Sequence, residues 1–126
     1  MFQKPTLRTI PLIDSSNVTN MDSMFEGNSS LRYFPKLDMG NVTSTNYMFG
    51  GCIKLAVLNL DHDSLATVIS NSQAMFNGTG RECLQSEGAD ADGISYVYVK
   101  DAATQSAVLS SDWCPSTWST ANVVIR

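Results

Sequence analysis

The chain of 126 residues carries eight Lys and Arg against twelve Asp and Glu, a formal net charge of −4. This acidic balance excludes a protein that binds nucleic acid through a basic face. The hydrophobic share of 43% and charged share of 16% describe one ordered domain, and no apolar run approaches the roughly 18 residues of a membrane span.

The first part of the chain repeats itself. Residues 17–40 read NVTNMDSMFEGNSSLRYFPKLDMG, and a looser copy, NVTSTNYMFGGCIKLAVLNLDHDS, follows at 41–64. Aligned positions lie 24 residues apart, as in Val18 and Val42, Met24 and Met48, Phe25 and Phe49, Gly27 and Gly51, and Leu31 and Leu55. A unit this short cannot bury its own apolar face, so its copies, called coils below, must stack on one another.

Each coil contains a strand pattern. The sequence Leu-x-x-Leu-x-Leu occurs at 7–12 and 55–60, and in part at 31–36. It predicts a strand whose side chains alternate between the interior and the outer face. Because the Met-Phe pair also occurs at 1–2 and 75–76, we expect about 3–4 coils over residues 1–80.

A second apolar section lies between the strands. Val18, Met21 and Met24 are spaced by three, which predicts a short helical or 3₁₀ turn on the wall opposite the strands. Glycines follow each Met-Phe pair and turn the chain back. We expect Phe25, Phe49 and the methionines of these segments to form the core.

The stretch SSNVTNMDSMFEGNSSLRYFPKLD resembles the BspA-like leucine-rich repeat, a family of bacterial surface proteins and of phages of such bacteria. The resemblance covers about residues 1–80. It implies a short solenoid of the leucine-rich-repeat type with parallel strands on one wall, and interaction or adhesion rather than catalysis. Cys52 occupies the motif cysteine, expected to be a small buried filler. The departures are Asn28 for Cys, Thr45 for Met, and Lys36 for an inward Leu, so the second coil is expected to be imperfectly sealed.

Residues 81–126 follow a different pattern. After a polar loop at 81–93, ISYVYVK at 94–100 predicts a strand, and Asp101 is expected to cap a helix over 102–111. Two tryptophans and an apolar stretch follow, similar to the closing unit of many BspA-like proteins. We expect residues 81–126 to form a capping unit over the last coil.

The start of the chain suggests an open face. Met1 and Phe2 fall on the Met-Phe position in the middle of a coil, shortly before Leu7. We expect these three residues to form an assembly face that another copy, a partner chain or an upstream segment covers. The opening residues also lack the pattern of a signal peptide.

Three motifs could indicate chemistry, and each has a simpler interpretation. The single histidine, His62, lies between two aspartates without a second histidine or a nucleophile, so a solvated turn is expected. GADADG at 88–93 lacks the first and last acidic positions of a calcium loop. The sequons at Asn17, Asn28, Asn41 and Asn77 are products of the repeat, with structural use preferred. We expect no catalytic residue, metal or cofactor.

The outward strand positions are the binding candidates. They are Thr9, Pro11, Arg32, Tyr33, Pro35, Val57, Asn59 and Asp61, with Ile13 and Leu37 on the same wall. Tyrosine and arginine carry much of the energy of protein interfaces. We expect a non-enzymatic module that binds protein or glycan at a cell surface or on a virion. The alternatives are a structural virion or fibre subunit that docks through its first coil and, with little support, an enzyme.

Overall fold

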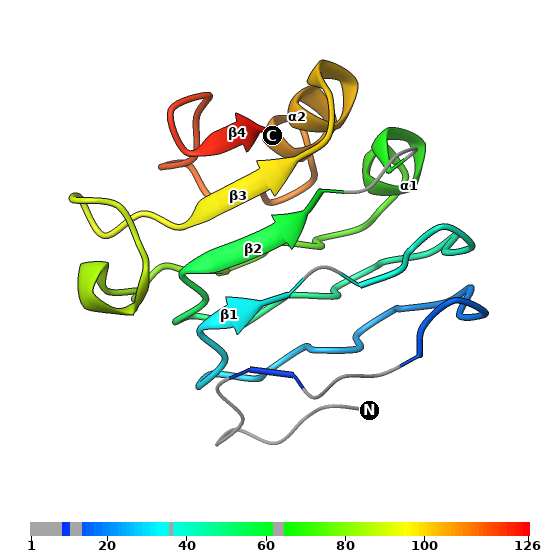
Figure 1. Ribbon diagram of the computed structural model, residues 1–126, viewed down its shortest axis with the longest axis horizontal. Helices are drawn as coiled ribbons and strands as arrows, with labels where there is room; N and C mark the ends of the chain where they lie inside the picture. Colours follow the sequence, from blue (N-terminus) through cyan, green and yellow to red (C-terminus); the bar gives the residue numbers. More distant parts are fainter. Residues whose placement is uncertain (1–8, 11–13, 36, 62–64) are drawn as a thin grey trace.

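The computed structural model describes residues 9–10, 14–35, 37–61 and 65–126. The elements follow in the order β1 (Tyr33–Phe34), β2 (Val57–Leu60), α1 (Ala66–Ser70), a 3₁₀ turn η1 (Gln85–Glu87), β3 (Tyr96–Val99), α2 (Ala102–Leu109) and β4 (Val123–Ile125). The strands lie on one side of the molecule, and the turns and helices that connect them lie on the other (Figure 1).

The four strands form one parallel sheet in the order β1-β2-β3-β4. Tyr33 pairs with Val57, which is the 24-residue shift of the sequence repeat, and Val57 pairs with Tyr96. An isolated parallel bridge between Thr9 and Tyr33 extends the pairing below β1. Because parallel neighbours require a crossover, the chain passes along the opposite wall between successive strands.

The wall opposite the sheet is made of consecutive turns, and the prediction of a short helix or 3₁₀ turn there is wrong. Ser23, Tyr47 and Ala74 occupy the same position in successive coils, and each has a left-handed backbone with φ of 56°, 57° and 49°. A left-handed residue ends a helix after one turn. It also turns neighbouring N–H groups sideways, so that Phe25 donates to the Met48 carbonyl (3.1 Å) and Phe49 to that of Met75 (2.9 Å).

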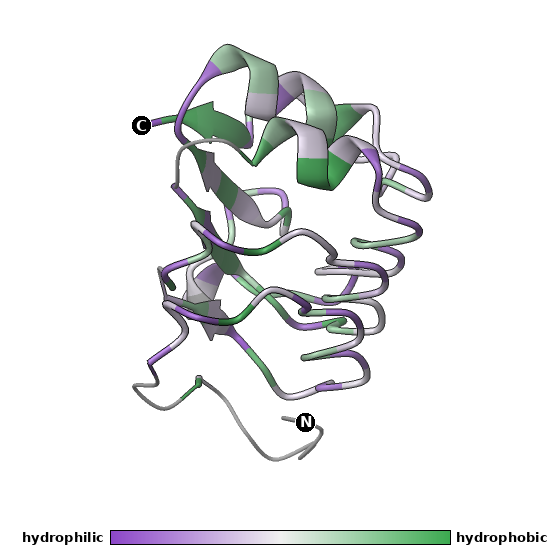
Figure 2. Ribbon diagram, turned by 90° about the vertical axis from the view of Figure 1, so that its right-hand side faces the viewer, coloured by the Kyte–Doolittle hydropathy of each residue, from purple (hydrophilic) through white to green (hydrophobic). Residues whose placement is uncertain are grey.

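The core is a stack of aromatic rings that runs through the coils. Phe25 lies 5.9 Å from Phe49, and Phe49 lies 6.1 Å from Phe76, with interplanar angles of 9° and 7°. Phe34 from β1 meets the first two rings edge-on. Methionines 21, 24, 48 and 75 are all buried around this stack, which confirms the expected core. The turns of successive coils lie above one another on the side away from the strands (Figure 2).

The motif cysteine position is a clasp between coils as well as a buried filler. The Cys52 thiol contacts the Phe25 carbonyl of the preceding coil (3.1 Å), and the Thr79 hydroxyl donates to the Phe49 carbonyl (2.8 Å) in the same way. Asn28, the first-coil equivalent, is fully buried, and its amide also donates to the Phe25 carbonyl (2.9 Å). Burial raises the pKa of Cys52 to about 12, so its thiol stays protonated and can donate.

Thr45, which replaces a motif methionine, does not leave the second coil open. Its side chain is 1% exposed, and its hydroxyl pairs with that of Ser72 in the next coil. A buried hydroxyl with a partner avoids the penalty of an unsatisfied group. The polar substitution is therefore sealed by a hydrogen bond where the motif uses a thioether.

Residues 81–126 form a further coil of the same stack. The expected elements are present, since β3 forms and the Asp101 carboxylate accepts from the Thr104 N–H (2.8 Å) at the start of α2. However, β3 and β4 extend the sheet, α2 packs on α1, and the Trp118 ring lies 5.3 Å from Phe76 within one continuous core. The expected boundary at residue 80 thus separates no packed units.

The sequence hides this coil behind an insertion. The offset between β2 and β3 is 39 residues (57 to 96), whereas that between β1 and β2 is 24 (33 to 57). Trp113 takes the left-handed position with φ of 61°, and the Cys114 N–H donates to the Ser111 carbonyl just as Met48 donates to that of Thr45. The loop at 81–93 accounts for most of the difference in length.

Gly78 and Gly80 offer a matched test of how closely the coils approach. Both have left-handed backbones, with φ of 72° and 70°, but a Cβ on Gly78 meets nothing within 4 Å, whereas one on Gly80 lies 1.9 Å from Ser95 Oγ and 2.9 Å from the Leu55 carbonyl. Gly78→Ala should cost about 1–2 kcal/mol of unfolding free energy. Gly80→Ala should cost about 1–3 kcal/mol more. Urea denaturation measures both, and equal losses would contradict the close approach.

Asp22 should make stability depend on pH. Its carboxylate accepts from the Ser44 hydroxyl and from the Asn46 N–H (2.8 Å) of the next coil. These bonds, the hydroxyl's first, hold the pKa of Asp22 below its ordinary 3.8. The stability that they supply is therefore present above pH 3.8 and is lost as the pH falls through the lowered value.

We expect Asp22→Asn to lower the urea midpoint at neutral pH and to match the wild type in strong acid. Asp112→Asn, at an exposed carboxylate, serves as the control for a general charge effect. A gap between wild type and Asp22→Asn that stayed constant with pH would show that the carboxylate charge plays no part.

Candidate functional site

The outer face of the sheet gathers the side chains with the strongest binding chemistry. In β3 the alternation is strict, with Val97 and Val99 fully buried and Tyr96 and Tyr98 half-buried on the outer side. The register places Tyr33 and Val57 in one row with Tyr96, and Asn59 beside Tyr98. The name outer wall is used below for Tyr33, Val57, Asn59, Asp61, Tyr96, Tyr98 and Arg126.

A hydrogen-bonded chain of side chains crosses the outer wall. The Asn59 amide nitrogen donates to the Tyr33 hydroxyl (3.1 Å), and the Arg126 guanidinium donates to the Asn59 amide oxygen (2.6 Å). These three residues come from β1, β2 and the end of β4. Both ends of the Asn59 amide are thus used, and the ring of Tyr33 and the guanidinium of Arg126 are fixed relative to each other.

Arg126 also orders the tyrosines. Its guanidinium carbon lies 4.0 Å from the centroid of the Tyr98 ring, a cation–π distance. The Tyr98 ring stacks on that of Tyr96 at 6.0 Å with an interplanar angle of 11°. Three tyrosines and one arginine therefore form a preorganised surface, which loses little side-chain entropy when a partner covers it.

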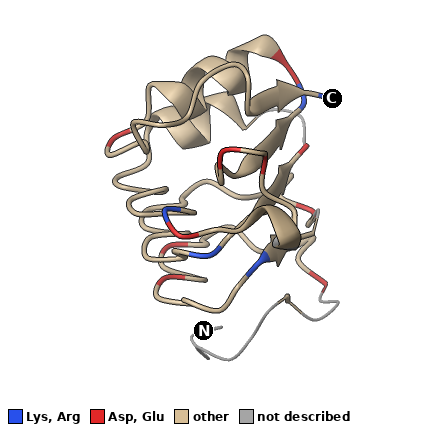
Figure 3. Cartoon of the chain, turned by 90° about the vertical axis from the view of Figure 1, so that its left-hand side faces the viewer, with Lys and Arg blue, Asp and Glu red and all other residues tan. Residues whose placement is uncertain are grey.

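Asp61 leaves one acceptor unused at the edge of this surface. Its Oδ2 lies 3.7 Å from Arg126 Nε, a separation at which the pair adds little stability. Its Oδ1 is buried and has no hydrogen-bond partner among the described residues. Figure 3 shows acidic and basic residues dispersed over this side of the molecule, without a patch of either sign. The outer wall is therefore aromatic and nearly neutral.

The predicted binding residues divide in the structure. Thr9 is exposed, Tyr33 is 42% exposed, and Arg32, Pro35, Val57 and Asp61 are half-buried. Asn59 is a correction, because the Tyr33 hydroxyl and Arg126 cover it and leave 5% exposed. Leu37 is also a correction at 6%, because β1 ends at Phe34 and the alternation does not reach it. The residues Met1, Phe2, Leu7, Pro11 and Ile13 lie outside the described part of the chain.

The loop at 81–93 covers part of the predicted surface. Ala56, Cys83 and Ala89 form a small cluster of their own, against which Val57 packs. The loop therefore removes the start of β2 from the accessible face. Sequence reasoning missed Tyr96, Tyr98 and Arg126 because they were assigned to a cap. The alternation in YVYV was the available signal, but the register that brings it beside Asn59 was not.

The other motifs take their simpler interpretations wherever they are described. Asp90 Oδ1 accepts from the N–H groups of Asp92 and Ile94 (both 2.9 Å), which makes GADADG a self-bonded turn. Asn28 is buried, and the Asn41 amide donates to the Ser16 carbonyl (2.6 Å), so both sequon asparagines have structural roles. His62 lies outside the described residues.

Two searches of the described residues return nothing. No cluster of three or more His, Cys, Asp or Glu within residues 9–10, 14–35, 37–61 and 65–126 could hold a metal ion. Over those same ranges, no helix has the length and apolarity needed to cross a membrane.

Stacked copies of one sequence unit, joined through their backbones, make this chain a repeat protein. The model of the family DUF285, described as a Mycoplasma protein of unknown function, matches residues 1–86, and the chain belongs to this family. No curated protein and no solved structure matches it. The matched residues contain the coils with Met-Phe pairs and end before β3.

Asn59 should be a stability residue as well as a wall residue. Asn59→Ala removes two hydrogen bonds at a buried position and should lower the unfolding free energy by about 1–3 kcal/mol. Asn17→Ala, at an exposed position, is the matched control. A double-mutant cycle with Arg126→Ala should give a coupling of about 0.5 kcal/mol or more. Additive losses would show that the two side chains do not interact in solution.

Proposed function

We propose that this protein is a non-enzymatic interaction module that binds a partner protein through the outer wall. The observation that carries the proposal is the fixed cluster of Tyr33, Tyr96, Tyr98 and Arg126 on one face of the sheet. Tyrosine and arginine are enriched at the energetic centres of protein interfaces. An open sheet surface of rigid aromatic side chains suits another protein better than a small molecule, which needs a concave site.

We also infer that the stack is a short solenoid of the leucine-rich-repeat type and belongs with the BspA-like repeats. Support comes from the parallel pairing at a 24-residue offset and from the repeated Met-Phe and cysteine-position contacts. The resemblance then suggests that the module acts at a cell surface or on a virion. The alternative of a structural subunit docking through Met1, Phe2 and Leu7 concerns residues outside the described chain, so no contact favours it.

The partner should contribute apolar surface and at least one hydrogen-bond donor. The rings of Tyr96 and Tyr98 offer area for apolar contact, and the free Asp61 Oδ1 needs a donor. A backbone N–H or a serine hydroxyl meets this need without adding a charge beside Arg126. Burial of Asp61 in the interface would then satisfy an atom that has no partner in the described chain.

The test is a binding screen with labelled protein against an array of extracellular and surface proteins. A genuine partner should lose at least about tenfold in affinity with Tyr98→Ala, which removes a hot-spot ring. Arg126→Ala should act in the same direction. Thr43→Ala, at an exposed position on the opposite wall, is the control and should bind normally. Partners that tolerate both outer-wall variants, or no partner at all, would contradict the proposal.

A further inference from the structure

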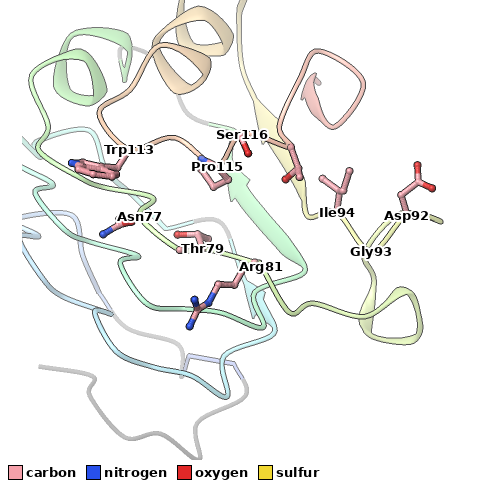
Figure 4. A pocket seen from close by; sticks show the side chains of 12 residues that line it. Asn77, Thr79, Arg81, Asp92, Gly93, Ile94, Trp113, Pro115 and Ser116 are labelled. Carbon is pink, nitrogen blue, oxygen red and sulfur yellow. The ribbon is translucent and has the colours of Figure 1, made fainter.

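A second candidate site lies away from the outer wall, where the third and fourth coils separate. It is a cavity of about 380 Å³, lined by Asn77–Arg81, Asp92–Ile94, Trp113 and Pro115–Thr117. This volume falls within the range of about 300–1,000 Å³ found for small-molecule sites. In Figure 4, Trp113 and Asn77 lie at one end, Ile94 and Asp92 at the other, and Thr79 and Pro115 between them.

The cavity occupies the place of missing contacts between coils. In the lower coils, the Gly27 N–H donates to the Gly50 carbonyl (2.8 Å) and the Gly51 N–H to that of Asn77 (2.9 Å). Gly78 is the next glycine in this series, and its N–H has no acceptor in the described chain. Gly78 lines the cavity, so an unused backbone donor is available to whatever enters it.

Trp113 gives the cavity an aromatic wall. It holds the left-handed position that Ser23, Tyr47 and Ala74 hold in the lower coils, and it is 69% exposed, whereas Trp118 is 7% exposed. Trp113 is the most exposed large apolar side chain of the described residues. An indole left open beside a concave site is suited to stack on a flat ligand.

The remaining lining is polar and balanced in charge. Asn77 offers an amide, and Ser116 and Thr117 offer hydroxyls. Arg81 is mostly free, since its side chain is 67% exposed and its only printed ion pair, with Glu82, is at 4.0 Å. Asp92 supplies the opposite charge. Such a lining holds both donors and acceptors but attracts no ion of either sign strongly.

We propose that this cavity binds a neutral saccharide. The C–H face of a sugar ring would stack on the Trp113 indole, whose π face is electron-rich. Sugar hydroxyls donate and accept, so they can bond to the Asn77 amide, the Gly78 N–H and the Arg81 guanidinium together. An extended peptide fits less well, because one free N–H is no strand edge and the apolar lining is limited to Trp113, Ile94 and Pro115.

The experiment uses the full chain labelled with ¹⁵N and titrated with galactose, mannose, N-acetylglucosamine and their β-linked disaccharides, alongside a glycan array. Binding should shift the amide signals of Gly78 and Gly93 and the indole N–H of Trp113, while the buried Trp118 indole stays unchanged. Trp113→Ala should weaken binding by at least about tenfold, and Trp113→Phe should retain part of it. Leu84→Ala removes an exposed apolar side chain outside the cavity and is the matched control.

Three results would overturn the proposal. The first is that no neutral glycan on the array shows binding that Trp113→Ala weakens. The second is that saccharide shifts map to Tyr96 and Tyr98. The third is that members of a peptide library, and not saccharides, shift the Gly78 and Trp113 signals. The amide spectrum of each variant also reports whether it folds. Because the outer-wall variants lie elsewhere, failure here leaves the proposed protein interaction to its own test.

Discussion

The hydrogen bonds between the backbones of neighbouring coils are the interaction on which the rest of this structure depends. Each coil has one non-glycine residue in the left-handed region, at Ser23, Tyr47, Ala74 and Trp113. Such a residue carries a conformational cost of about 1–2 kcal/mol. It persists because it turns alternate N–H groups toward the next coil, as in the bond from Phe49 to Met75. The stack of phenylalanine rings then follows from coils held in register.

The same constraint explains where the molecule departs from regularity. In the lower coils the glycine N–H groups are satisfied by the coil above, and side chains such as Cys52 and Thr79 reinforce the joint. At the fourth coil the sheet and the helices remain packed, but Gly78 loses its acceptor and a cavity opens beside Trp113. The two candidate sites thus arise from one stack, one where its register holds and one where its coils separate.

The outer wall shows how a parallel sheet can make a binding surface from residues distant in sequence. Tyr33, Asn59 and Arg126 span most of the chain, yet they are linked by two hydrogen bonds. Each strand supplies only one or two outward side chains, so the surface exists only when four strands lie side by side. Its rigidity comes from Arg126, which bonds to one neighbour and covers another.

The sequence by itself determined the repeat, the buried Phe and Met residues, the helix cap at Asp101 and the outward position of Tyr33. These are local or periodic properties, and a period of 24 residues requires neighbouring copies to match. It could not show the left-handed turns at Ser23 and Tyr47, because non-glycine residues rarely adopt that backbone and nothing local marks it. Nor could it show that Asn59 is covered, since Tyr33 and Arg126 reach it from other strands.

Only the tertiary structure decided that residues 81–126 continue the stack. The 81–93 insertion breaks the period, so alignment could not place Tyr98 beside Asn59 or Trp113 above Gly78. Register and coil spacing are set by hydrogen bonds and packing between segments far apart along the chain. Both candidate sites depend on those distances, which is why the residue types were visible in the sequence and their assembly was not.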